Sequence, residues 1–434
     1  MLQRILLSMM FGLSPVPALA QDVLRGHGGP VRALAVNGAA RELISGSFDS
    51  TVIVWDLRRG TAKRVLRFHE GPVNAVAVLG NGCIASGGED KKVALWCEER
   101  GAPAYVLKDH EAPVTSLAPS AAFSPDGVAL DAVSASFDGT VRHSVLGTGG
   151  RQMIVTQHKG PVTAVAATPD RTGVISAGPD GALAFTKLDA NGGWGPLPGQ
   201  VTITALAVAP DGEIVAACAD GNVRLHSALG AMTANIELDG TPLASLALSP
   251  DGKLIATAGL RGGIAIMDRA SRKIIHRLTG PGLPVWSLAF DTDSRTLFSG
   301  GADRTIRRWD AVAGKALSST LPERDLVAEA VAGGERGAVV FRACQACHTL
   351  SPDDGNRAGP TLYRLFGRRI GTAAGYNYSD ALPKMNIVWT METVARLFEV
   401  GPNAFTPGTK MPEQTLTNSS DRHALVEWLE RVTR

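Results

Sequence analysis

The 434-residue chain has few cysteines and aromatic residues, almost no net charge, and little long apolar sequence. Its formal charge of +2 provides no basic field, so nucleic acid and anionic membranes are not expected as main partners. Aromatic residues make up 5% of the chain while glycine occurs 49 times, a balance that favours tight turns over long helices. The length exceeds one ordinary domain, so two or three domains are expected.

Because cysteine and histidine are scarce, one pattern of them is informative. With five cysteines and nine histidines, a Cys-x-x-Cys-His run is expected by chance about once in a thousand such chains. The chain has this run at Cys344, Cys347 and His348, and the spacing is the attachment signature of c-type haem. A structural zinc site would need a second pair of ligands, and a redox dithiol would need a βαβ context. Neither lies nearby in the sequence, so we predict one covalent haem c per chain, with His348 as an iron ligand.

The amino-terminal residues 1–20 are typical of a secretory signal. Arg4 precedes an apolar stretch from Ile5 to Leu13, and small residues end the segment at Ala20. This apolar stretch is shorter than the roughly 20 residues of a membrane span, and no later stretch is long enough either. We therefore expect an exported, periplasmic protein without a transmembrane span, and we regard a membrane anchor as the weaker alternative.

Residues 21–320 contain an internal repeat. Short runs of alternating apolar and polar residues, separated by glycine or aspartate, indicate β-strands. Turn aspartates recur at spacings of 41, 48, 42, 40, 41 and 42 residues if Arg261 fills one missing position. These aspartates are Asp49, Asp90, Asp138, Asp180, Asp220 and Asp303.

The repeat resembles the WD-repeat family at Gly26-His27 and Trp55-Asp56. Seven such units imply an all-β, seven-bladed propeller. The resemblance also implies that a histidine, a serine, an aspartate and a tryptophan form a hydrogen-bonded chain within a blade, so these polar residues are structural rather than catalytic. They are His27, Ser45, Asp49 and Trp55 in unit one and His69, Ser86, Asp90 and Trp96 in unit two.

Three features of the repeat region have two interpretations each. Either Asp22–Arg25 or Lys315–Thr320 can supply the outer strand of the seventh unit. About seven extra residues around 119–126 lengthen unit three, as a partner contact or as a tolerated surface loop. Cys83 and Cys97 flank a turn and form either a cross-strand disulfide or two buried thiols.

The β pattern stops after residue 320. Residues 321–334 are charged and alanine-rich and are predicted to be a linker or a short helix, followed by a separate domain at residues 335–434. One helix is expected to lead into Cys344, and another near the carboxyl end carries Leu425, Trp428 and Leu429 on one face. We expect these two helices to pack together.

Residues 335–434 resemble a mitochondrial-type class I cytochrome c, which is an all-α domain. We therefore predict a multidomain chain, with an all-β seven-bladed propeller followed by an all-α class I cytochrome c domain. Beyond the haem motif, the resemblance is carried in order by Gly-Pro-Thr-Leu-Tyr at 359–363, Leu-Phe-Gly-Arg-Arg at 365–369, Gly-Tyr-Asn-Tyr-Ser-Asp-Ala at 375–381, Trp389, and Pro-Gly-Thr-Lys-Met at 407–411.

The resemblance implies which residues hold the haem. Met411 would be the second iron ligand, with Met385 and Met391 as rivals in the same domain. The carbonyl of Pro360 would accept the second imidazole N–H of His348. A haem propionate would lie among Arg368, Tyr378 and Trp389.

Two positions depart from the family pattern. Leu382 stands where asparagine is common, and Phe398, or Leu397 on another count, stands where a tyrosine is common. Both changes make the haem crevice less polar. This domain also has a basic cluster, which either faces an acidic partner or forms a solvated surface. The cluster consists of Arg364, Arg368, Arg369 and Lys410.

The function predicted from these features is single-electron transfer by an exported c-type cytochrome. The propeller would be a protein-docking scaffold, and a redox protein would be the partner. Ligation by histidine and methionine fills both axial positions, which favours an electron carrier over a substrate-converting enzyme, and no catalytic side chain is predicted. The alternatives are a propeller-based oxidoreductase with the cytochrome as its electron outlet, and a haem-based redox or gas sensor.

Overall fold

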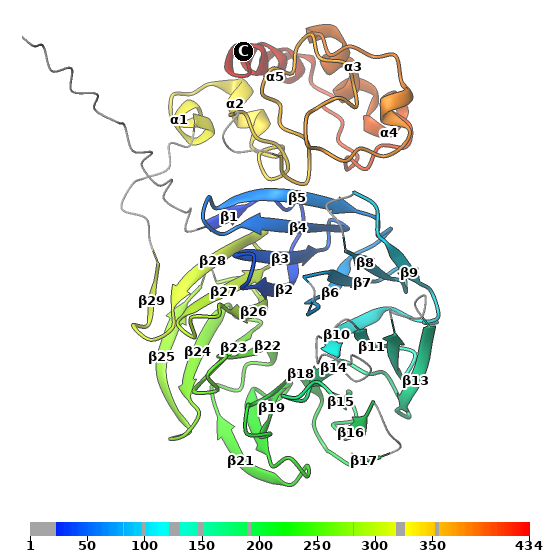
Figure 1. The fold of residues 1–434 in the computed structure, drawn as a ribbon. Coiled ribbons are helices and arrows are strands. Elements are labelled where there is room, and N and C mark those ends of the chain that lie inside the picture. Colours follow the sequence, from blue (N-terminus) through cyan, green and yellow to red (C-terminus); the bar gives the residue numbers. More distant parts are fainter. Residues whose placement is uncertain are drawn as a thin grey trace, which may run out of the picture.

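The computed structural model describes residues 23–80, 82–97, 101–120, 131–145, 151–188, 192–280, 282–317, 326–351 and 356–434. The predicted signal segment and most of the extra loop of unit three lie outside these ranges. Figure 1 shows a ring of β-sheets with a helical carboxy-terminal region against one part of its rim, beside β4 and β5. Among the described residues, no helix is both long and apolar enough to cross a membrane.

The described strands of the ring form seven antiparallel sheets, which are the seven blades predicted from the repeat. In blades one to six, four consecutive strands lie side by side, so each repeat folds into one meander. Blades one to three contain β2 (Val31–Asn37), β3 (Glu42–Ser47), β4 (Thr51–Asp56), β5 (Thr61–Arg67); β6 (Val73–Val78), β7 (Ile84–Gly88), β8 (Val93–Trp96), β9 (Tyr105–Leu107); and β10 (Val114–Ser120), β11 (Asp131–Ser136), β12 (Thr140–Val145), β13 (Arg151–Gln157). Blades four to six contain β14 (Ala164–Ala167), β15 (Gly173–Ala177), β16 (Leu183–Lys187), β17 (Gly193–Leu197); β18 (Ile203–Val208), β19 (Ile214–Cys218), β20 (Asn222–His226), β21 (Met232–Glu237); and β22 (Leu243–Leu248), β23 (Leu254–Gly259), β24 (Gly263–Asp268), β25 (Lys273–Thr279).

Blade seven closes the ring with strands from both ends of the repeat region. Its inner strands are β26 (Val285–Phe290), β27 (Thr296–Gly301) and β28 (Thr305–Asp310). The first half of β28 pairs with β1 (Val23–Arg25), and its last two residues pair with β29 (Lys315–Ala316). Both segments that the sequence offered therefore supply the outer strand, each along a different part of the same edge.

Apolar side chains of neighbouring blades interlock to form the core of the ring. Ile44 of blade one packs with Val73 of blade two, and Val31 of blade one packs with Phe298 of blade seven. The second strand of each blade, such as β3, is buried on both faces, because it lies between two blades. A blade is therefore stable only between its neighbours.

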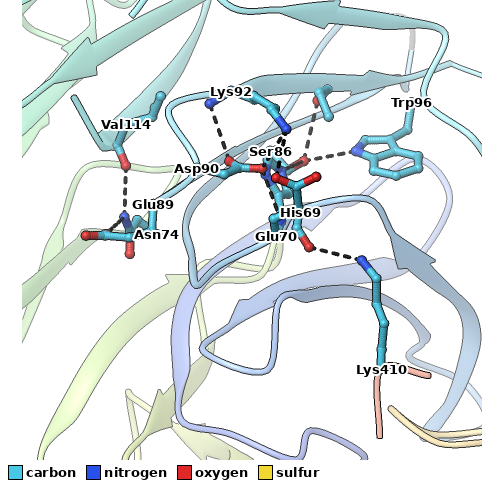
Figure 2. Close-up of polar contacts among 11 residues, drawn as sticks. His69, Glu70, Asn74, Ser86, Glu89, Asp90, Lys92, Trp96, Val114 and Lys410 are labelled. Carbon is cyan, nitrogen blue, oxygen red and sulfur yellow. Dashed lines mark hydrogen bonds and ion pairs between the residues drawn. The ribbon is translucent and has the colours of Figure 1, made fainter. Parts of the chain in front are cut away.

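The predicted hydrogen-bonded chain is present in blades one and two. In blade one, Ser45 Oγ lies 2.7 Å from His27 Nε2 and accepts from Trp55 Nε1 at 2.8 Å, while His27 Nδ1 lies 3.0 Å from the Asp49 carboxylate. The imidazole thus connects the turn to the buried tryptophan, as the resemblance implied. Figure 2 shows the corresponding contacts in blade two, among His69, Ser86, Asp90 and Trp96.

A disulfide joins Cys83 and Cys97 in blade two, with their Cα atoms 4.2 Å apart. Cys83 directly precedes β7 and Cys97 directly follows β8, so the bond crosses the open end of this hairpin. Of the two interpretations of this pair, the structure supports the disulfide. Cys218 is a buried free thiol in the core of blade five.

The carboxy-terminal region is built around two contacting helices. Its helices are α1 (Leu326–Ala332), α2 (Arg336–Phe341), the 3-10 turn η2 (Leu382–Lys384), α3 (Met391–Val400), α4 (Pro402–Phe405) and α5 (Ser419–Val432). The rings of Phe341 in α2 and Trp428 in α5 have centroids 5.1 Å apart, so the predicted packing of the first and last helices of the domain is confirmed. Helix α1 lies in the range predicted as a linker or short helix, and its Val327 joins the core of this region. An antiparallel bridge between Arg369 and Val388 lies within the irregular segment before α3.

Candidate haem site

A cavity of about 430 Å³ lies within the helical region and extends to blade one of the propeller. This volume is in the range of small-molecule and cofactor sites. The eight residues predicted from the sequence come from segments up to 67 positions apart, yet the fold brings all of them to this cavity. They are Cys344, Cys347, His348, Pro360, Arg368, Tyr378, Trp389 and Met411.

The Cys-x-x-Cys-His motif forms one wall of the cavity. Helix α2 ends at Phe341, and the chain continues in a tight turn where the N–H groups of Cys347 and His348 donate to the Cys344 carbonyl at 3.1 and 3.0 Å. This turn brings both sulfurs and the imidazole to the same cavity. Burial raises the pKa of the Cys344 thiol to about 12 and that of Cys347 to about 11. Among the described residues, no group of three or more histidine, cysteine, aspartate or glutamate side chains is placed to hold a metal ion, so the motif lacks the further ligands of a structural zinc site.

His348 is oriented from both sides. Its Nδ1 donates to the carbonyl oxygen of Pro360 at 2.7 Å, so the contact predicted for Pro360 is present. This hydrogen bond leaves the lone pair on Nε2, the arrangement that a metal-binding histidine needs. Burial lowers the pKa of His348 to about 4, so the imidazole is neutral. Gly359 packs directly against the ring, and a Cβ atom at this position would overlap it.

Met411 reaches the same cavity from the loop after α4. The side chain is half-buried, and its backbone N–H donates to Thr409 Oγ1 at 3.1 Å, which stabilises the loop. Neither Met385 nor Met391 is among the described residues that line the cavity. Met391 is instead 41% exposed at the start of α3. Of the three methionines, Met411 is therefore the one that lines the cavity.

Arg368, Tyr378 and Trp389 add polar groups to the cavity. The Arg368 guanidinium donates to the carbonyls of Thr361 and Tyr363 at 2.7 and 3.1 Å, which holds it in one orientation. Burial lowers the pKa of Arg368 and raises the pKa of Tyr378, so the phenol is neutral. A cation and two side-chain N–H or O–H donors are thus available for a buried anionic group.

The two departures from the family pattern also lie at the cavity. Leu382 lines it, and so do both Leu397 and Phe398 of α3, so either count from Trp389 leads to an apolar wall. The basic cluster is not a free patch. Besides the carbonyl contacts of Arg368, Lys410 Nζ donates to the carbonyl oxygen of His69 at 3.4 Å, across to the propeller (Figure 2).

Sequence reasoning missed the propeller's share of this cavity. No local pattern indicates which blade the helical region contacts, because that contact joins segments hundreds of residues apart. One signal was present in the repeat: glycine at position 28, where blades two to four have a charged residue. The propeller residues that line the cavity are Gly28, Gly29, Pro30, Phe48, Asp49 and Arg67.

The fold and the cavity define a WD-repeat propeller joined to a helical region with a haem-attachment motif. The family "WD domain, G-beta repeat" matches residues 20–56, 60–97, 101–143, 195–227 and 272–310, and the structure adds blades four and six. The chain is 41% identical over 101 residues to a cytochrome c of Cochliobolus lunatus, covering 23% of this chain and 93% of that relative. It is also 41% identical over 101 residues to a cytochrome c of Arabidopsis thaliana, covering 23% of this chain and 89% of that relative. A cytochrome c2 of Rhodoplanes tepidamans is 40% identical over 95 residues, which cover 22% of this chain and 88% of that relative. Through its carboxy-terminal region, the chain belongs to the cytochrome c family.

Proposed function

We propose that the protein is an exported electron-transfer haemoprotein whose propeller is a docking scaffold for a protein partner. One observation carries the proposal: Cys344, Cys347, His348 and Met411 line the same cavity. The similarity to cytochromes c supports it, since these relatives are haem proteins that transfer electrons. A bound haem supplies one-electron exchange between Fe(III) and Fe(II).

The residues of the chain divide the work of binding. Cys344 and Cys347 would attach one haem covalently, and His348 and Met411 would be its axial ligands. The Pro360 carbonyl holds the neutral imidazole with Nε2 free. As a ligand, the thioether of Met411 would stabilise Fe(II) relative to Fe(III), which would raise the reduction potential. If His348 and Met411 both bind the iron, no coordination site is left for a substrate, and no side chain needs to act as acid, base or nucleophile.

The polar side chains of the cavity would pair with a charged group of the cofactor. Arg368 supplies a fixed positive charge, and Tyr378 and Trp389 supply donors, where a buried carboxylate of the haem would otherwise be unpaired. Leu382 and Phe398 keep the rest of the wall apolar. An apolar wall keeps water away from the haem iron.

Two independent features support export to the periplasm. Residues 1–20 have the cationic start, apolar stretch and small-residue end of a secretory signal. Cys83 and Cys97 form a disulfide, and disulfides persist in oxidising compartments.

The proposal is tested by absorption spectra of the oxidised and reduced protein, with and without carbon monoxide, for the wild type, Met411→Ala and Met391→Ala. We expect a low-spin wild type that is indifferent to carbon monoxide, because both axial positions are filled. Met411→Ala should bind carbon monoxide, and Met391→Ala should behave like the wild type. Carbon monoxide binding by the wild type would contradict the proposal in favour of a sensor, and a second chromophore would favour a propeller-based oxidoreductase.

A further inference from the structure

We propose that blade one of the propeller is the outer wall of the haem site. In this arrangement Gly28 leaves room for the edge of the site at Cys347, and Arg67 places a positive charge beside that edge. The inference rests on the proposed function, because it takes the cavity to hold a haem joined to Cys347. It extends that function by making the propeller part of the redox centre as well as a scaffold beside it.

Two hydrogen bonds hold the helical region against the loops of the propeller. The Ala358 N–H donates to the Gly26 carbonyl of blade one at 2.7 Å. Lys410 Nζ donates to the His69 carbonyl, where the chain enters blade two, at 3.4 Å (Figure 2). Ala358 lies two residues before Pro360, whose carbonyl accepts from His348, and Lys410 directly precedes Met411. The contacts therefore involve the segment of Pro360, which orients His348, and the segment of Met411.

Gly28 is the place where the propeller approaches the attachment motif. A Cβ atom built on Gly28 would lie 2.5 Å from Cys347 Sγ, far inside the roughly 3.5–4.0 Å of an ordinary contact. The backbone of Gly28 is not in the left-handed region, so its conformation alone does not require glycine. The absence of a side chain at this position is therefore explained by the sulfur of Cys347.

Blades two to four have a long charged side chain at the position that Gly28 occupies in blade one. The segment that reads His-Gly-Gly-Pro at 27–30 reads His-Glu-Gly-Pro at 69–72, His-Glu-Ala-Pro at 110–113 and His-Lys-Gly-Pro at 158–161. The backbone N–H groups of Gly28, Glu70 and Glu111 all donate to the aspartate of their blade, at 2.7, 3.2 and 3.0 Å. The loop therefore accepts a long charged side chain without losing its hydrogen bond. In blade one such a side chain would occupy the space of the haem edge.

Arg67, the last residue of β5, brings a positive charge to the same wall. It lines the cavity, and its guanidinium lies 5.1 Å from the centre of the Tyr376 ring, which belongs to the helical region. Its buried Nε has no hydrogen-bond partner among the described residues. A cation next to the haem disfavours the more positive Fe(III) state, so Arg67 should raise the reduction potential.

The covering of this edge has a consequence for electron exchange. Gly28 and the neighbouring residues of blade one line the site beside the half-buried Cys347. A redox partner that approaches this edge therefore meets blade one as well. Changes in the propeller should therefore alter the redox properties of the haem.

The test compares Gly28→Glu with Lys159→Glu in the full-length holoprotein. Both place a glutamate directly after the histidine of a blade, but the exposed Lys159 lies in blade four. Amide hydrogen exchange at Ala358 reports the contact with Gly26, and a redox titration reports the midpoint potential. In Gly28→Glu we expect exchange at Ala358 to become faster by about tenfold or more, because the contact opens, and the midpoint potential to fall. Lys159→Glu should leave both unchanged.

A second pair of variants removes a group instead of adding one. Arg67→Ala should lower the midpoint potential, while Arg58→Ala should not, because Arg58 is exposed and lies in the turn at the other end of the β4–β5 hairpin. Arg67→Ala adds no bulk, so it decides the matter if Gly28→Glu does not fold. A haem-loaded Gly28→Glu with wild-type exchange at Ala358, or an Arg67→Ala with the wild-type potential, would overturn the inference. Absence of covalent haem from the wild type would instead overturn the proposed function.

Discussion

The buried serine hydroxyls of the blades allow a graded test of the propeller's stability. Ser45 Oγ has two buried side-chain partners, since it lies 2.7 Å from His27 Nε2 and accepts from Trp55 Nε1 at 2.8 Å. In Ser45→Ala both partners lose this contact, and the residual packing cannot replace it. Among the described residues, Ser299 of blade seven has Trp309 Nε1 as its one side-chain partner, at 2.8 Å, because that blade lacks the histidine.

The magnitudes follow from the number of groups left unpaired. Leaving one buried polar group without a partner costs about 1–3 kcal/mol. Ser45→Ala should therefore lower the free energy of unfolding by about 2–6 kcal/mol, and Ser299→Ala by about 1–3 kcal/mol. Ser134→Ala in blade three is a second single-partner case, because Ser134 Oγ contacts His110 Nε2 at 2.8 Å and Ser144 stands at the tryptophan position.

Urea unfolding followed by far-ultraviolet circular dichroism measures these differences, provided that the dependence on denaturant stays the same among the variants. The expected order is a large loss for Ser45→Ala and smaller, similar losses for Ser299→Ala and Ser134→Ala. If all three variants lost the same stability within about 0.5 kcal/mol, the number of hydrogen-bond partners would not be the cause, and the reasoning would be refuted.

Three further predictions concern the disulfide, an acid-sensitive turn and the helix contact. Reducing the Cys83–Cys97 disulfide, which spans 14 positions, should lower the free energy of unfolding by about 3 kcal/mol; an unchanged unfolding curve in reductant would contradict this. Burial alone would raise the pKa of Asp138, but hydrogen bonds from neighbouring hydroxyl, backbone and imidazole groups outweigh it and hold the pKa at about 2. Because the folded pKa is below the ordinary value, this stabilisation is complete above about pH 4 and is lost as the pH falls towards 2, and unfolding curves for Asp138→Asn should lack this contribution. Gly337→Ala should destabilise the helical region by about 1–3 kcal/mol, because the new Cβ overlaps a backbone carbonyl of α5; Gly333→Ala, which meets nothing closer than 3.5 Å, is the control for thermal unfolding.

Much of the candidate site could be predicted because its chemistry depends on residue types and spacings within short stretches of sequence. The Cys344 to His348 segment has residue types and a spacing that suit covalent haem attachment, and one tight turn brings its sulfurs and imidazole to the same cavity. Met411 was preferred to two other methionines because of its local Pro-Gly-Thr-Lys context, and it is the one of the three that lines the cavity. The blades were equally predictable, because the period of the aspartates follows directly from the length of one four-stranded meander.

Contacts between distant segments could not be predicted in the same way. Local pattern offered two outer strands for blade seven, and only the closed ring shows that β1 and β29 share one edge of β28. Cys83 and Cys97 had a plausible spacing, but whether they bond depends on the distance across a finished hairpin. These outcomes depend on how whole surfaces meet, and a local pattern does not contain that information.

The sequence by itself therefore determined the number of blades, the haem motif and the eight residues of the helical region that were named for the haem site. Only the tertiary structure decided that this region rests on blade one, with Gly28 against Cys347 and Arg67 over Tyr376. The physical reason is the range of the interactions. Hydrogen-bonding patterns and ligand spacings act over a few residues, whereas the docking of two domains depends on the shape and charge of surfaces that exist only after both have folded.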